Sequence, residues 1–181
     1  MKKIYYNWQQ VQGAVLDIAR QLSVDSWRPD YIVGITRGGA IPAVLLSQYI
    51  GVPMKPLEVS LRDGGMCVSD LGMAEEAFGC VPLEEQDVIK SRWDVSFKKN
   101  ILVVDDINDT GATISWIKND WASGCFPNET NVWDKVWGNN VRFAVLTDNQ
   151  ASNESVDYSC WEVNKAEEDC WLVYPWEDFW K

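Results

Sequence analysis

Four consecutive aliphatic residues, Ile101-Leu102-Val103-Val104, constrain the fold of this chain more than any other segment. A strand alternates its side chains between the two faces of a sheet, so an unbroken apolar run predicts a strand buried on both faces. Such strands occur in parallel sheets that are covered by helices on both sides. We therefore expect an α/β fold with a mainly parallel central sheet flanked by helices.

Strand and helix patterns alternate through most of the chain, as the connections of a parallel sheet require. The length of 181 residues predicts a single domain, residues 1–181. The segments 61–99 and 125–140 have weak periodicity and are expected to be loops. The expected helices are residues 8–22 (capped by Asn7), 41–50 and 112–124, and the expected strands are residues 31–35, 54–60, 101–104 and 142–147.

The composition excludes several classes of site and partner. The 27 acidic and 16 basic residues give a formal net charge of −11, which disfavours a nucleic-acid partner because duplex binding needs a basic surface. The chain has no histidine, which excludes Ser-His-Asp and Cys-His nucleophile pairs and His-ligated metals. The five cysteines include no CxxC pair, which predicts a cytoplasmic protein. No apolar run reaches the ~18 residues that a bilayer requires, so no membrane partner is expected.

An acidic segment follows the 101–104 run. Asp105, Asp106 and Asp109 are costly next to a buried strand unless a cation or hydroxyl groups meet them. The following Thr110-Gly111-Ala112-Thr113 opens the expected helix and offers free backbone N–H groups and two hydroxyls to an anion. One short segment thus provides acids for a metal or for sugar hydroxyls, and donors for a phosphate.

A second unusual segment, Thr36-Arg37-Gly38-Gly39, follows the expected strand 31–35. Ligands of open parallel sheets bind at the carboxyl ends of the strands, so both segments are candidate binding loops. The alternative for the acidic segment is a solvated turn with a helix cap, since Asp and Thr are common cap residues. A calcium loop starting at Asp106 would need glutamate where Ile117 stands, and the Gly-Lys-Ser/Thr of a P-loop does not occur.

The acidic segment resembles the phosphoribosyl-diphosphate signature of type I phosphoribosyltransferases. Residues 103–113, Val-Val-Asp-Asp-Ile-Asn-Asp-Thr-Gly-Ala-Thr, have its order of apolar residues, two acids, two spacers and Asp-Thr-Gly. Residues 35–39 are similar to the pyrophosphate loop of that family. Residues 169–177, Asp-Cys-Trp-Leu-Val-Tyr-Pro-Trp-Glu, resemble the base-binding end of xanthine-guanine and related purine phosphoribosyltransferases. The likeness runs from about residue 5 to residue 178.

The resemblance implies the type I phosphoribosyltransferase fold and transfer of ribose 5-phosphate from phosphoribosyl diphosphate to a nucleobase, first of all a purine. Pyrophosphate would leave, and Mg²⁺ would be the cofactor. Asp109 would be the general base, while Asp105 and Asp106 would hold the ribose hydroxyls and, partly through water, the metal. The implied binding residues are Thr110, Gly111, Ala112 and Thr113 for the 5-phosphate, Thr36, Arg37, Gly38 and Gly39 for pyrophosphate, and Trp171 (by stacking) and Leu172 (by its backbone) for the base.

The resemblance also implies two accessory regions. Residues 61–99 correspond to a flexible lid that closes over the site, and residues 150–181 to a C-terminal hood that binds the base. Glu177 in this hood is a further candidate metal ligand. Relatives of this kind are often homodimers, so a homo-oligomer is expected.

One position departs from the family pattern. Purine members usually have a lysine at the end of the strand that corresponds to residues 143–147, where it donates to the 6-oxo group. This chain has Asp148 there. Asp148 could accept from an amino group, or Asn149 could shift in and donate. Two alternatives stay open beside purine transfer: a phosphoribosyltransferase with a non-purine acceptor, and a regulator that binds phosphoribosyl diphosphate without catalysis.

Overall fold

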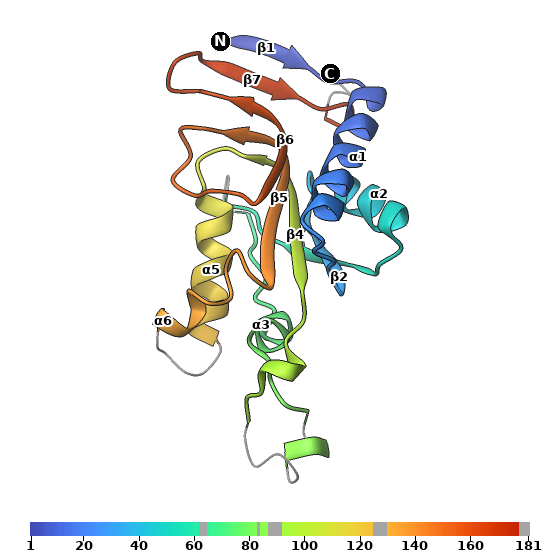
Figure 1. Ribbon diagram of the computed structural model, residues 1–181. Helices are drawn as coiled ribbons and strands as arrows, with labels where there is room; N and C mark the ends of the chain where they lie inside the picture. The colour runs from blue at the N-terminus through green and yellow to red at the C-terminus, as the bar shows by residue number, and fades with distance from the viewer. Residues whose placement is uncertain (62–64, 83, 87–91, 125–129, 178–181) are drawn as a thin grey trace.

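The computed structural model describes residues 1–61, 65–82, 84–86, 92–124 and 130–177. Its centre is a five-stranded parallel sheet of order β3-β2-β4-β5-β6, and β1 and β7 form a second, two-stranded sheet. The expected helix-flanked parallel sheet is confirmed (Figure 1). The strands are β1 (Lys2–Tyr5), β2 (Tyr31–Thr36), β3 (Met54–Glu58), β4 (Ile101–Asn108), β5 (Val141–Asn149), β6 (Tyr158–Val163) and β7 (Cys170–Val173), and the helices include α1 (Trp8–Val24), α2 (Ala40–Ile50), α3 (Leu71–Phe78), α5 (Ala112–Gly124) and α6 (Thr130–Trp133).

Strand β4 is buried on both faces, as its apolar run predicts. Ile101 and Val103 belong to a core cluster that also contains residues of α3 and α5. Leu102 and Val104 belong to a second cluster, formed with α1 and α2. Figure 1 shows α1 and α2 on one side of the central strands and α5 on the other. The middle strand therefore joins two hydrophobic cores and fixes where its acidic end lies.

The helices that cover the sheet begin and end at residues with clear physical roles. Asn7 caps α1 in a reciprocal capping box, because its side chain accepts from the backbone N–H of Gln10 and the Gln10 side chain accepts from that of Asn7. Helix α2 ends at Gly51, whose φ of 66° is left-handed and suits glycine. The stripe of α1 that faces the core consists of Val11, Ala14, Val15, Ile18 and Leu22.

The two-stranded sheet brings the two ends of the chain together. Lys3 of β1 pairs with Trp171 of β7, and Ile4 pairs with Leu172. Figure 1 shows this sheet beyond the end of the central sheet, next to the start of α1. The sequence patterns had not indicated a strand at residues 2–5, because four residues are too few to display a period.

The structure corrects three of the expected boundaries. Loops were wrongly expected throughout 61–99 and 125–140, which contain α3, a 3₁₀ turn at Val95–Phe97 and α6. Helix α3 has only eight residues between its Asp70 cap and Gly79, too short for a visible period. Strand β4 runs to Asn108, so Asp105 and Asp106 belong to the strand itself. Parts of the predicted lid, loop and hood lie outside the described residues, at 62–64, 83, 87–91, 125–129 and 178–181.

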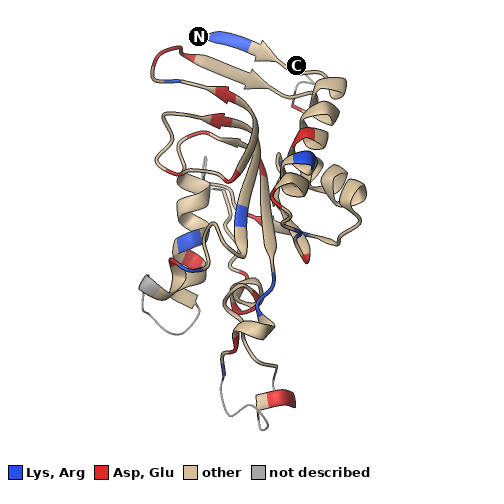
Figure 2. Cartoon of the chain, viewed as in Figure 1, with Lys and Arg blue, Asp and Glu red and all other residues tan. Residues whose placement is uncertain are grey.

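The charged residues are scattered over the fold. Figure 2 shows Lys and Arg as short blue segments separated by tan and red ones, on strands, helices and loops. The absence of a nucleic-acid partner stays a prediction from the net charge. Within the described ranges, none of the helices has the length and apolarity needed to cross a bilayer.

The packing of α3 makes a testable prediction about stability. Met73 is 2% exposed in the α3–α5 core, whereas Val95, in the same 61–99 segment, is 76% exposed. We expect Met73→Ala to lower the free energy of unfolding by about 2–5 kcal/mol, because it leaves a cavity, and Val95→Ala to change it by about 0.5 kcal/mol or less. Urea unfolding measures both. Equal, small effects would show that α3 is not part of the core.

Candidate active site

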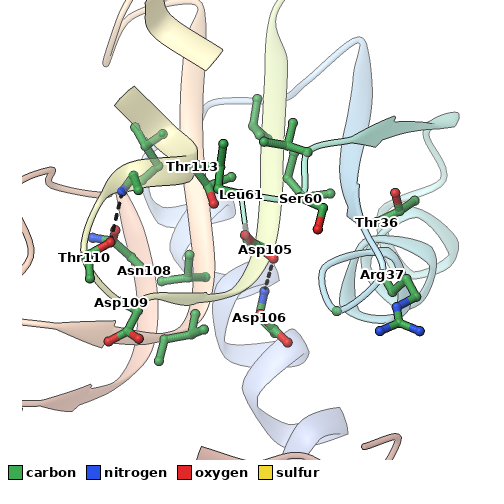
Figure 3. Close-up of a pocket in the computed structure, with 18 of the residues that line it drawn as sticks. Thr36, Arg37, Ser60, Leu61, Asp105, Asp106, Asn108, Asp109, Thr110 and Thr113 are labelled. Atoms are coloured by element: carbon green, nitrogen blue, oxygen red, sulfur yellow. Dashed lines mark hydrogen bonds between the residues drawn. The ribbon is translucent and has the colours of Figure 1, made fainter. Parts of the chain in front are cut away.

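A cavity of 960 Å³ lies at the carboxyl end of the central sheet. Its lining contains the acidic end of β4, the turn that follows β2, the segment after β3 and part of the C-terminal hood. Figure 3 shows Thr36 and Arg37 on one side of Asp105 and Asp106, with Asp109 and Thr110 on the other. Among the predicted site residues, the lining includes Thr36, Arg37, Gly38, Asp105, Asp106, Asp109, Thr110, Gly111, Ala112, Thr113, Trp171 and Glu177.

The two acids of β4 are held by short contacts. The backbone N–H of Asp106 donates to Oδ1 of Asp105 at 2.9 Å. The Tyr174 hydroxyl donates to the backbone carbonyl of Asp106 at 2.9 Å and also lies 2.9 Å from Oγ1 of Thr147. Burial raises the pKa of Tyr174 well above its ordinary value, so this hydroxyl keeps its proton. A residue of the hood thus positions the backbone of the acidic strand end.

The predicted phosphate segment, Thr110 to Thr113, forms the turn into α5. Gly111 has a φ of 86°, and a Cβ there would lie 2.8 Å from the backbone nitrogen of Glu154. Because α5 begins at Ala112, its first backbone N–H groups have no partner within the helix. That of Ala112 donates to Thr110 Oγ1 at 3.4 Å, and that of Thr113 can be offered to an anion. The turn has the conformation and the donors that a phosphate requires.

Glu154 stabilises this turn through hydrogen bonds to α5 and to the end of β4. Its carboxylate accepts from Ser115 Oγ at 2.8 Å and from Lys118 Nζ at 2.6 Å, both on α5. Its backbone carbonyl accepts from Asn108 Nδ2 at 2.7 Å. The segment after β5 therefore fixes both the end of β4 and the first turns of α5. The sequence analysis had not singled out Glu154, since nothing local marks a contact across about 40 positions.

The turn after β2 packs directly on β4. A Cβ at Gly39 would lie 2.4 Å from the carbonyl oxygen of Val104 and 2.7 Å from Cα of Asp105. A Cβ at Gly38 would lie 2.0 Å from Oδ2 of Asp106. The two glycines let the turn approach the acids, which places Thr36 and Arg37 beside them. The peptide bond between Thr36 and Arg37 is cis.

The other end of the cavity combines the carboxylate of Asp109 with aromatic rings, and a lysine outside the described lining pairs with that carboxylate. Oδ1 of Asp109 lies 2.9 Å from Nζ of Lys165, which belongs to the connection between β6 and β7. Trp171 lines the cavity and is 42% exposed. Trp176 also lines it and stacks on Tyr174 with ring centroids 4.9 Å apart. This end offers an acid and a flat apolar surface to a heterocycle.

Three predicted site residues are not part of the cavity lining among the described residues: Gly39, Asp148 and Leu172. Gly39 lies against the backbone of β4, and Leu172 is buried in the core beside α1. Oδ1 of Asp148 accepts from Asn108 Nδ2 at 2.8 Å. The amide group of Asn149 donates to the backbone carbonyl of Asp109, so it supports the site rather than facing a ligand.

Sequence reasoning missed Tyr174 and Lys165. Tyr174 stands within the 169–177 segment that carried the family likeness, but the sequence pattern does not indicate the contact of its hydroxyl with Asp106. Lys165 lies 56 positions after Asp109, in a turn without a motif, and only the fold brings the two together.

The close contact at Gly39 predicts a loss of stability on enlargement. We expect Gly39→Ala to lower the free energy of unfolding by about 1–3 kcal/mol, because the new methyl group would overlap backbone atoms that cannot rotate away. Gly13, inside α1 and with nothing within 4 Å of its virtual Cβ, is the control; Gly13→Ala should raise stability by about 0.5–1 kcal/mol. Urea unfolding of both variants tests this, and a gain in both would contradict it.

Comparisons with known proteins agree with this geometry. A family model described as a phosphoribosyl transferase domain matches residues 1–177. The hypoxanthine-guanine phosphoribosyltransferase of Schizosaccharomyces pombe is 25% identical over 198 aligned positions, which cover 97% of this chain and 89% of the relative. Xanthine phosphoribosyltransferase 1 of Saccharomyces cerevisiae is 21% identical and covers 97% and 90%. The crystal structure of a purine phosphoribosyltransferase from Pyrococcus horikoshii superimposes with a TM-score of 0.64 at 26% identity and covers 100% and 98%. The chain belongs to the phosphoribosyltransferase family.

Proposed function

We propose that this chain transfers ribose 5-phosphate from phosphoribosyl diphosphate to a purine base and releases pyrophosphate. The observation that carries the proposal is the arrangement of one cavity. The acids Asp105 and Asp106 lie between two glycine-containing turns, Thr36–Gly38 and Thr110–Thr113. A sugar with a phosphate group at each end requires this order of polar and anion-binding groups.

Each part of the donor substrate has a matching group. The 5-phosphate binds the turn at Thr110–Thr113, where backbone N–H groups and the helix dipole favour an anion. The pyrophosphate group binds Thr36–Gly38, where Arg37 adds a positive charge. The ribose hydroxyls then donate to the carboxylates of Asp105 and Asp106.

The chemistry requires positioning and one proton transfer. The bond from ribose C1 to pyrophosphate breaks, and pyrophosphate leaves with the electron pair. A ring nitrogen of the base then forms the new bond to C1 and gives its proton to the carboxylate of Asp109. Asp109 lines the cavity directly before the phosphate turn, which suits this role.

Magnesium is the cofactor in this proposal. Mg²⁺ commonly binds one or two carboxylates and substrate phosphates and keeps several waters. Asp105 and Asp106 offer two carboxylates, and the part of the chain that the structure describes holds no cluster of three or more His, Cys, Asp or Glu residues that would form a protein-only metal site. The ion would neutralise the charge of the leaving pyrophosphate. Glu177, in the cavity lining, is a further candidate ligand.

The acceptor base binds beside Trp171 in this proposal. The half-exposed ring of Trp171 can stack on a flat heterocycle, and the backbone of the adjacent Leu172 would read the edge of the base. The names of the yeast relatives, which act on hypoxanthine, guanine or xanthine, favour a purine.

A cytoplasmic location and a homodimer remain predictions. Cys67, Cys80, Cys160 and Cys170 are free thiols, in keeping with a reducing compartment.

Screening the purified protein for pyrophosphate release tests the proposal. The assay mixes phosphoribosyl diphosphate and Mg²⁺ with hypoxanthine, guanine, xanthine, adenine, uracil or orotate, one at a time. Release with a purine supports the proposal. Release only with a pyrimidine supports the non-purine alternative, and donor binding without release from any base supports the regulator.

The role of Asp109 makes a separate prediction. We expect Asp109→Asn to lower kcat by about 100-fold or more, because the amide cannot accept the proton of the base. The affinity for phosphoribosyl diphosphate, measured by calorimetry, should stay within about threefold of the original value. Asp120→Asn, on α5 and outside the cavity lining, is the matched control. Equal turnover of both variants would remove Asp109 from the mechanism.

A further inference from the structure

The two-stranded sheet forms one wall of the cavity. Side chains alternate between the two faces of a strand, so Lys3 of β1 and its partner Trp171 of β7 share one face. Both residues line the cavity, as does Val173, two positions after Trp171. The neighbours of Trp171, Cys170 and Leu172, face the other way and are only 4% and 6% exposed in the core. Lys3 therefore brings a positive charge to the wall that carries the proposed stacking surface.

Backbone hydrogen bonds fix the place of this lysine. The backbone N–H of Lys2 donates to the carbonyl of Asp169 at 3.0 Å, and that of Tyr6 donates to the carbonyl of Val173 at 2.9 Å. Figure 2 shows the first half of β1 as a blue segment alongside β7. Because β1 is tied to β7 at both ends, the lysine between them stays beside the stacking surface.

The charge of Lys3 is not neutralised within the described part of the chain. Lys2, on the other face of the strand, pairs with Glu168 at 2.9 Å, whereas no ion pair joins Lys3 to another described residue. The cations in the described lining are Lys3 and Arg37, and Arg37 belongs to the turn proposed for pyrophosphate. Lys3 is thus the cation that this lining offers next to Trp171.

The chemistry of oxopurines converts this placement into selectivity. A heterocycle that stacks on Trp171 brings its rim next to Lys3. A positive charge stabilises a neighbouring negative charge and adds much less to a neutral group. Xanthine loses a ring proton near neutral pH, whereas hypoxanthine and guanine stay neutral there. The base of xanthosine 5-monophosphate is likewise an anion at neutral pH, and that of inosine 5-monophosphate is neutral.

We propose that Lys3 is a specificity-determining residue, which makes this site prefer an oxopurine that carries a negative charge, such as xanthine, over a neutral one, such as hypoxanthine. This preference rests on the proposed function, because a base must stack on Trp171 for its rim to reach Lys3. The selection comes from β1, at the opposite end of the chain from the segment that carries the stacking ring.

Binding of two product nucleotides tests the inference without relying on turnover. Xanthosine and inosine 5-monophosphate have the same ribose and phosphate, so the ratio of their affinities in calorimetric titration at neutral pH reports on the base alone. We expect the original chain to bind xanthosine monophosphate about 3- to 10-fold more tightly, between the contribution of an exposed ion pair and that of a charged hydrogen bond. Lys3→Met, which removes the charge, should lower this ratio by about threefold or more.

Three controls make the result specific. Lys3→Arg keeps the charge and should keep the ratio, while Lys2→Met changes the adjacent lysine on the other face and should leave it unaltered. Titration with pyrophosphate and Mg²⁺ tests whether Lys3 instead serves the leaving group; its affinity should stay within about twofold in Lys3→Met. Lys3→Gln, also uncharged, provides a second measurement if the methionine variant does not fold.

Each outcome decides the matter. A ratio that falls in Lys3→Met and persists in Lys3→Arg and Lys2→Met supports the inference. An unchanged ratio in a folded, uncharged Lys3 variant, or a loss of pyrophosphate affinity in its place, would overturn the inference and leave the proposed function standing, because the original chain would still bind a purine nucleotide. If the original chain binds neither nucleotide and releases no pyrophosphate with any purine, the proposed function fails, and the inference fails with it.

Discussion

The burial of β4 on both faces is the constraint on which the rest of this structure depends. Ile101 and Val103 enter one core while Leu102 and Val104 enter the other, so the strand cannot shift without disturbing both. Its carboxyl end then leaves the core at a fixed point, with the carboxylates of Asp105 to Asp109 projecting into the cavity. Burial of the apolar run thus offsets the unfavourable free energy of holding several carboxylates close together.

A stack of aromatic rings joins the hood to this centre. The Tyr6 ring lies between Trp161 and Tyr174, with centroids 4.2 Å and 5.3 Å away, and Tyr174 in turn stacks on Trp176. Because the Tyr174 hydroxyl also donates to the carbonyl of Asp106, the hood that carries Trp171 and the strand that carries the acids are connected through one side chain. Trp161 and Trp176 therefore have a structural role in holding the hood against the sheet.

The sequence predicted the parts of the site that are local. The apolar run before Asp105, the glycine turns and the helix start at Ala112 each carry their own signal within a few residues, and the structure brings them to one cavity. The sequence could not predict contacts between distant segments. Lys165 reaches Asp109 only because β5 and β6 pair and the next turn folds back. Helix α3 was missed for a different reason, since eight residues are too few to display a helical period.

Calorimetric titration of phosphoribosyl diphosphate, with and without Mg²⁺, tests the central claim most directly. The claim is that two anion-binding turns and the acids between them form one site. Ribose 5-phosphate and pyrophosphate, each of which could occupy one turn, serve as the matched ligands. The account predicts one site per chain, tighter binding with Mg²⁺, and an affinity for the whole donor well above that for either fragment. Absence of binding, or a donor affinity no greater than that for pyrophosphate alone, would contradict it.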